Sequence, residues 1–255
     1  MTVARSAAPL FVLEPWIDDH GSAVLMLLNP SGGLAGADHM RCEVELGCGA
    51  HACLTTPSAT RVYRADGAPT VVETIIRLEA HATLEYVPDH LILHAGAALH
   101  QSLQIELGPA SRAFIYDAFS AGRIARGECW QFRELANDVS VLSGNQPLFI
   151  SRQRLRPAER LPAAPGVMDG YHYLATCGAF SADRFEGERL AARMNGLIDA
   201  AGEEVSGAAD MLSAGSVVAT VLTRSASALG ACLRQLWAAA RSVLCGLPPL
   251  DLRKY

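Results

Sequence analysis

The sequence predicts a mainly β protein: a single domain of layered, stacked strands with about two amphipathic helices near the C-terminus packed on the sheet. Three observations predict this class. Apolar and polar residues alternate with the period of a half-buried strand over much of residues 24–155. Turn-forming residues separate these runs. Apolar stripes with the three-to-four-residue spacing of a helix appear after residue 181.

The chain length fits one domain covering residues 1–255. Half of the residues are hydrophobic and 18% are charged, which is enough for a large core. Within this domain we expect a β body over about 24–180 and a helix-containing C-terminal part over about 181–255.

The strands are the clearest elements. In LHQSLQIEL (99–107), Leu99, Leu103, Ile105 and Leu107 fall on one parity, and His100, Ser102, Gln104 and Glu106 fall on the other. The runs at 70–80 and 112–119 are rich in β-branched and aromatic residues, which strands favour. A proline-rich segment at 156–166 is interpreted as a crossing loop, after which 171–180 resumes a strand.

A weak internal echo links LGCGAHACL, LEAHATLEY and LGPASRAFI. Matching Ala52, Ala82 and Ala113 gives steps of 30 (82−52) and 31 (113−82) residues. A period near 30 in a β-rich chain indicates stacked strand–turn–strand layers, each burying the face that its neighbour leaves open.

Two helices are expected in the C-terminal part. Ser181 is a candidate cap for a helix over about 183–200, and Ser225 for a second helix that ends at Gly246. Between them, residues 210–224 read as a hairpin that turns at Ala214-Gly215.

The loop LLNPSGGLAGAD (27–38) raises the question of phosphate binding. A Walker loop needs a lysine after its second glycine, and the only lysine in the chain is Lys254. A dinucleotide fingerprint needs a helix next, whereas RCEVELG predicts a strand. We therefore expect the glycines to permit a tight reversal and close packing between strands, and Asp38 is the residue of this loop suited to a cation.

Other activities have little support in the sequence. There is no G-x-S-x-G or H-E-x-x-H motif, so a hydrolase built from the eight histidines and many serines is a minor alternative. The net charge of −5 gives no bulk attraction to nucleic acid. The apolar segments match neither a signal peptide nor a membrane span, so we expect a cytoplasmic protein.

The seven cysteines are expected to be free thiols packed as small hydrophobes. A soft-metal site among Cys42, Cys48 and Cys53 is the alternative, although their spacing matches no zinc pattern.

Carboxylates within apolar runs suggest a second kind of site. Glu85 in ATLEYVP and Glu128 in ARGECWQF are costly to bury unless they are hydrogen-bonded, paired or bound to a cation. His90 and His94 would share one face and can bind a divalent cation. The alternatives are a structural hydrogen bond or a solvated face for the acids, and an exposed polar pair for the histidines.

Four blocks, LLNPSGGLAGADHM, GAHACLTTPSATRVYR, ATLEYVPDHLILHAGAALHQ and AFSAGRIARGECWQFREL, occur in an order that resembles the urease accessory protein UreD family, called UreH in some organisms. The family usually reads Gly-Gly-Asp where this chain has Gly36-Ala37-Asp38, and its basic, aromatic C-terminal tail is replaced by LPPLDLRKY. The matched motif positions are Gly32, Gly33, Gly36, Thr55, Thr56, Thr60, Arg61, Tyr63, Arg64 and Gly127.

The resemblance implies a β-rich, non-enzymatic scaffold that docks on apo-urease with UreF and, through UreF, with the GTPase UreG. It further implies weak, transient Ni²⁺ binding during GTP-dependent maturation of the urease active site. The residues expected along a nickel route are Asp38, Glu85 and Glu128, with His90 and His94 behind them. The alternative is a purely structural docking adaptor that does not itself carry nickel.

Overall fold

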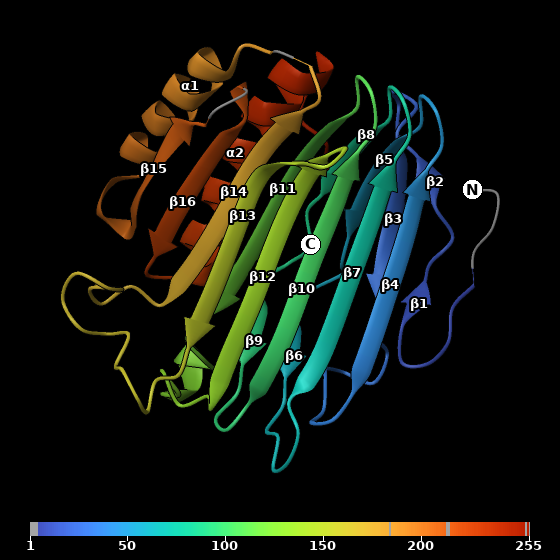
Figure 1. Cartoon of the computed structure of the whole chain (residues 1–255). Coiled ribbons are helices and arrows are strands. Elements are labelled where there is room, and N and C mark those ends of the chain that lie inside the picture. Colours follow the sequence, from blue (N-terminus) through green and yellow to red (C-terminus); the bar gives the residue numbers. More distant parts are fainter. Residues whose placement is uncertain (1–4, 184, 213–214, 253, 255) are drawn as a thin grey trace.

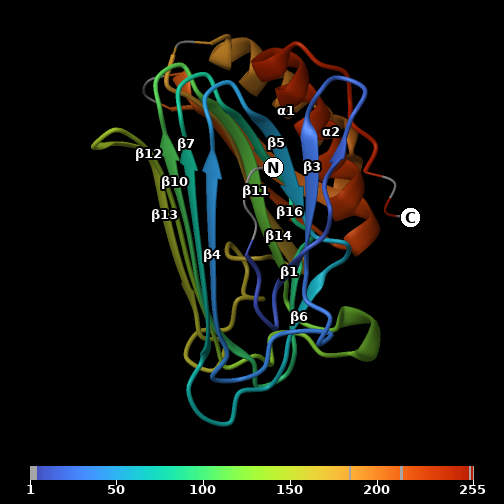
Figure 2. The ribbon, with the colours of Figure 1, turned by 90° about the vertical axis from the view of Figure 1, so that its right-hand side faces the viewer.

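The computed structural model describes residues 5–183, 185–212, 215–252 and 254. Within these residues, strands form one sheet of eleven and one of five, and two α-helices accompany them. Figure 2 shows three layers: the five-stranded sheet, the eleven-stranded sheet, and the helices on the outer face of the larger sheet. The predicted class, mainly β with stacked layers and two helices, is confirmed.

The larger sheet has the order β1-β3-β5-β8-β11-β14-β16-β15, with β2, β6 and β9 beside this path, and the smaller has the order β13-β12-β10-β7-β4 (Figure 1). In the larger sheet the strands are β1 (Phe11–Val12), β2 (Trp16–Ile17), β3 (Ala23–Leu28), β5 (His51–Thr55), β6 (Thr60–Val62), β8 (Thr83–Tyr86), β9 (Leu91–Leu93), β11 (Arg112–Ser120), β14 (Tyr173–Ser181), β15 (Val205–Met211) and β16 (Val217–Thr223). In the smaller sheet they are β4 (His39–Leu46), β7 (Thr70–Leu78), β10 (Ala98–Leu107), β12 (Glu134–Ser143) and β13 (Gln146–Leu155).

The chain alternates between the two sheets in successive coils. Strand β4 turns into β5, β7 into β8, and β10 into β11, and equivalent strands of successive coils pair in parallel. The internal similarity with a period of about 30 residues therefore corresponds to the successive coils of the structure. The predicted alignment of the three copies is wrong in the middle copy. Ala52 lies opposite Leu84, and Leu84 opposite Ala113, so the steps are 32 (84−52) and 29 (113−84) residues. Ala82 instead lies just before β8, in the turn.

The alternating pattern has its expected consequence between the sheets. Leu99, Leu103, Ile105 and Leu107 of β10 are all buried, as their shared parity predicts. Leu103, Ile105 and Leu107 belong to a core whose other members come from both sheets, among them Ile76, Leu84, Ile115 and Val141. Leu99 packs in a second cluster, with Phe119 and Leu135.

The two helices cover the opposite face of the larger sheet. Helix α1 (Gly187–Ala200) and helix α2 (Ala226–Cys245) share an apolar cluster with β11, β14, β15 and β16. The Ser225 hydroxyl caps α2 by accepting the backbone N–H of Ala228 at 3.2 Å, and Gly246 ends the helix with φ +66°. Both ends of α2 are as predicted.

The predicted start of the first helix is wrong. Ser181 is the last residue of β14, paired with Arg112, and its hydroxyl accepts the backbone N–H of Asp183 at 3.2 Å. Helix α1 begins at Gly187, after Glu186, which makes no side-chain cap. Sheet pairing holds Ser181 in an extended conformation, so the helix begins after the chain has left the sheet.

The predicted hairpin is present as β15 and β16, which pair antiparallel from Val205↔Thr223 to Met211↔Val217. Of its predicted turn, Ala214 lies outside the described residues and Gly215 has φ +82°. The larger sheet thus continues beyond the stretch 24–180. The expected crossing loop at 156–166 is observed as turns between β13 and β14. Among the described helices, none combines the length and apolar character needed to cross a membrane.

Candidate functional site

The glycine-rich loop packs directly against the segment TRVYR. The backbone N–H of Leu34 donates to the Arg61 carbonyl, and that of Tyr63 donates to the Leu34 carbonyl, each at 2.8 Å. A Cβ on Gly33 would lie 2.7 Å from both the Arg61 carbonyl oxygen and the Tyr63 ring. The Tyr63 hydroxyl donates to the Gly32 carbonyl at 3.0 Å. The interpretation of these glycines as a means of close packing is confirmed.

The other motif residues also make contacts between layers or end local elements. The Thr55 hydroxyl donates to the Val87 carbonyl at 2.6 Å, and the Thr56 hydroxyl accepts the backbone N–H of Asp89 at 2.9 Å. Gly36 lies so close to Ala65 that a Cβ would sit 2.8 Å from its Cα. Thr60 begins β6, Arg64 pairs with Asp66, and Gly127, with φ +75°, ends the short helix Ile124–Arg126.

Asp38 closes the glycine loop on itself. Its carboxylate accepts the backbone N–H of Ala35 at 2.8 Å, and its backbone N–H donates to the Ala35 carbonyl at 3.2 Å. The side chain is only partly buried. The structure thus gives Asp38 a role in the turn.

Glu128 is paired with arginine. Its carboxylate accepts Arg123 Nε at 2.8 Å and Nη2 in a second, shorter contact, and it accepts the backbone N–H of Ala95 at 3.3 Å. The hydrogen bonds from Arg123 hold the pKa of Glu128 below its usual value, against the opposing effect of burial.

The two histidines contact different tyrosines. The His94 ring meets Tyr63 edge-on, with centroids 5.1 Å apart, and the His90 ring meets Tyr173 in the same way at 5.5 Å. Burial lowers the pKa of both imidazoles. His94 is also electrostatically coupled to Glu128, and its Nε2 is buried without a hydrogen-bond partner. The structure therefore brings His94 and Glu128 into one neighbourhood.

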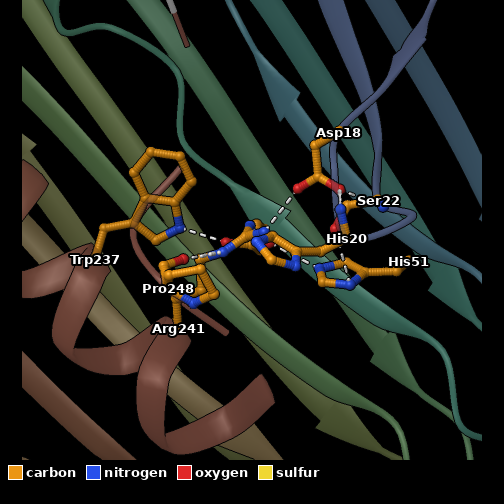
Figure 3. Close-up of polar contacts among 8 residues, drawn as sticks. Asp18, His20, Ser22, His51, Trp237, Arg241 and Pro248 are labelled. Atoms are coloured by element: carbon orange, nitrogen blue, oxygen red, sulfur yellow. Dashed lines mark hydrogen bonds and ion pairs between the residues drawn. The ribbon is translucent and has the colours of Figure 1, made fainter. Parts of the chain in front are cut away.

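Glu85 lies at the centre of a buried polar network that joins three parts of the chain. Figure 3 shows how Asp18, His51, Trp237 and Arg241, the other main members of this network, converge from separate segments. Its side chain is 1% exposed, and it forms an ion pair with Arg241 of α2, which is fully buried. Its carboxylate also accepts Trp237 Nε1 at 2.5 Å and His51 Nε2 at 2.7 Å. Because a carboxylate only accepts, Nε2 of His51 carries the hydrogen.

Each nitrogen of the Arg241 guanidinium donates a hydrogen bond. Its Nε donates to the Pro248 carbonyl and its Nη2 to the Asp18 carboxylate, both at 2.8 Å, in addition to the contact with Glu85. Asp18 also accepts the backbone N–H groups of Ser22 and His20, at 2.7 and 2.9 Å. Burial alone would raise the pKa of Asp18, but these N–H groups and Arg241 together lower it.

The sequence indicated only one member of this network. Glu85 was conspicuous as an acid within an apolar run, and its requirement for a partner is confirmed by the arginine pair. Asp18, His51 and Arg241 were not identified as its partners. The sequence feature that could have identified a partner is Arg241, a charged residue on the apolar face of α2. It lies one helical turn after Trp237, on the buried stripe that also carries Leu244.

A cavity of about 210 Å³ lies between the sheets, next to the glycine loop. Its lining includes the motif residues Gly32, Gly33, Thr56, Thr60 and Arg61, and within it lie Cys42, Tyr86 and Asp117. Gln101 Nε2 donates to Asp117 at 2.9 Å, and Asn137 Nδ2 makes a shorter contact with it. Desolvation raises the pKa of Asp117, partly offset by these two amides.

None of the five sequence-predicted metal residues lines this cavity. Across the described part of the chain, no group of three or more histidine, cysteine, aspartate or glutamate side chains is arranged to hold a metal ion. All seven cysteines are free thiols, and Cys53, Cys177 and Cys232 are buried.

The fold and its sites define a layered β protein in which a buried ion-pair network on Arg241 connects the larger sheet to α2, and a cavity lined by both apolar and polar residues lies between the two sheets. A sequence model described as UreD urease accessory protein matches residues 1–254. The chain belongs to the UreD family of urease accessory proteins.

Individual relatives cover most of the chain. The urease accessory protein UreD of Deinococcus radiodurans is 31% identical over 97% of this chain and 86% of its own length. The UreD protein of Ralstonia nicotianae is 31% identical over 98% and 86%. That of Haloarcula marismortui is 29% identical over 91% and 77%.

Proposed function

We propose that this protein is a non-enzymatic accessory factor of urease maturation. It docks on apo-urease together with UreF, reaches UreG through UreF in the cytoplasm, and passes Ni²⁺ toward the urease active site during GTP-dependent maturation. Membership of the family over residues 1–254 supports the role in maturation, because the relatives are named urease accessory proteins.

The observation that carries the nickel step is the cavity between the sheets. It combines the carboxylate of Asp117 and the thiol of Cys42 with motif residues of the family in its lining. Asp117 is held by Gln101 and Asn137, which fix its position without supplying a competing positive charge. A site with few ligands binds a divalent ion weakly, which suits a carrier that must release it.

This proposal shifts the nickel route away from two of the predicted residues. Glu85 and Glu128 each hold an arginine, and a guanidinium already bound to a carboxylate competes with a metal ion for the same oxygens. We propose that these two acids maintain the fold. Asp38, His90 and His94 remain predicted contributors.

The test uses urease co-expressed with its accessory proteins. Asp117→Asn keeps the size of the side chain and removes its charge, and Cys42→Ser removes the thiol. We expect each variant to lower the nickel content per urease active site while still being captured with UreF and apo-urease. Full nickel loading by the double variant, with capture intact, would exclude this cavity as the route.

A second function, a docking adaptor that carries no nickel, is favoured by the arginine pairs of Glu85 and Glu128. Equilibrium dialysis of the complex with UreF against Ni²⁺ separates the two proposals. Binding that is lost in Asp117→Asn supports carriage, and absence of binding by the intact complex supports the adaptor.

A further inference from the structure

The segment of residues 5–17, here called the N-terminal strap, lies along the open end of the two-sheet body. In Figure 2 its strand β1 lies between β4, the end strand of the smaller sheet, and β3 of the larger one. Its strands β1 and β2 pair only with β3. Leu10 lines the cavity, as do Cys42 and Asp117. The strap therefore forms part of the cavity wall.

The strap is held weakly along its length. Strands β1 and β2 have two residues each, and the backbone N–H of Leu13 adds one bond to the Met26 carbonyl at 3.0 Å. Its large apolar side chains are only partly buried, since Phe11 is 40%, Trp16 39% and Ile17 64% exposed. Segments with few buried contacts open at a small fraction of the free energy of global unfolding.

By contrast, the chain is firmly anchored immediately after the strap. Asp18 is buried and bonded to Arg241, and it accepts the backbone N–H groups of His20 and Ser22. Gly21, with φ +85°, completes the turn into β3. Residues 18–22 are thus a fixed end about which the strap can lift while the fold stays intact.

We propose that the N-terminal strap is a movable cover of the inter-sheet cavity, and that its lifting admits the ion to Cys42 and Asp117. This regulation rests on the proposed function of the cavity in nickel passage. The strap itself, however, can be tested without nickel, because the thiol of Cys42 reports access to the cavity.

The strap can be locked with a disulfide. Val12 and Leu27 face each other across the antiparallel β1–β3 pair. Directly opposed residues in such a pair have Cα atoms roughly 4.5–5.5 Å apart, within the range of a disulfide. In the complex of the full chain with UreF, Val12→Cys combined with Leu27→Cys is oxidised, and the 12–27 bond is verified by mass spectrometry.

The first measurement is the rate at which iodoacetamide alkylates Cys42, with the exposed Cys48 as the internal reference. We expect oxidation to slow the alkylation of Cys42 at least tenfold and to leave the alkylation rate of Cys48 unchanged. The control is the same variant, reduced and desalted. Equal rates of Cys42 alkylation in the oxidised and reduced forms would overturn the proposal that the strap covers the cavity. As a second variant, Leu10→Ala should speed the alkylation of Cys42 several-fold, because it removes part of the cavity wall. An unchanged rate in this variant also counts against the proposed cover.

The second measurement is nickel transfer to apo-urease in a reconstituted mixture with UreF and UreG. Loss of transfer in the oxidised form, recovered on reduction, supports both the strap and the cavity route. If oxidation slows the alkylation of Cys42 but leaves nickel transfer unchanged, the strap is a cover of the cavity and the cavity is not the nickel route. If oxidation does not slow the alkylation of Cys42, the proposal that the strap covers the cavity is rejected, whatever the result for nickel transfer.

Discussion

Arg241 and Glu85 form a buried ion pair although 156 positions separate them in the sequence. The pair joins α2 to β8, and the second carboxylate on Arg241, Asp18, extends it to the segment before β3. The start, middle and end of the chain therefore meet at a single guanidinium.

Arg241→Met should lower the free energy of unfolding by roughly 3–5 kcal/mol, because it leaves two buried carboxylates without their counter-charge. Chemical denaturation at pH 7 measures the loss. The matched control is Arg234→Met on the exposed side of the same helix, with an expected change within about 0.5 kcal/mol. Equal effects of the two variants would contradict the structural role of the network.

Asp18 should make stability depend on pH at the acid end. Its pKa is lower in the folded chain than its ordinary value of 3.8, so its contribution is complete above that value and is lost as the pH falls through the folded pKa. Urea midpoints between pH 2.5 and 7 should drop less steeply below pH 4 in Asp18→Asn than in the unmodified chain. If the midpoints of the two proteins fall in parallel as the pH is lowered, the Asp18 carboxylate does not stabilise the folded chain.

Asp117 should behave in the opposite way. Its pKa is raised in the folded chain, so the unfolded chain loses this proton first and stability falls as the pH rises from the ordinary value through the folded one. Asp117→Asn removes this loss. Its urea midpoint should exceed that of the unmodified chain at pH 7, and the two should converge near pH 3. A residue that costs stability yet supports nickel loading would be retained for function.

Gly33→Ala should lower the free energy of unfolding by about 1–3 kcal/mol, because the added methyl group meets the Arg61 carbonyl and the Tyr63 ring at 2.7 Å. Gly67→Ala is the control, since a Cβ there meets nothing within 4 Å. Thermal unfolding of both variants is the measurement. A Gly33→Ala protein as stable as the control would mean that the two segments can move apart at little cost.

Much of the fold could be predicted because it follows local patterns. The parity of Leu99 to Leu107 determined which face of β10 is buried, and Ser225 and Gly246 marked both ends of α2. The echo indicated coils, but matching by alanine misaligned the middle copy by two residues. An even shift keeps each side chain on its correct face, so the packing prediction survived an error in register. The start of α1 was missed because sheet pairing overrode the capping preference of Ser181.

The sequence by itself determined the family, the strand layers and the requirement of Glu85 for a partner. Only the tertiary structure decided that this partner is Arg241 and that Asp117, Cys42 and Leu10 meet at one cavity. The physical reason is distance along the chain. Periodicity records which face of an element is buried, but contacts between residues of different coils depend on the register and twist of the sheets, which no local pattern encodes.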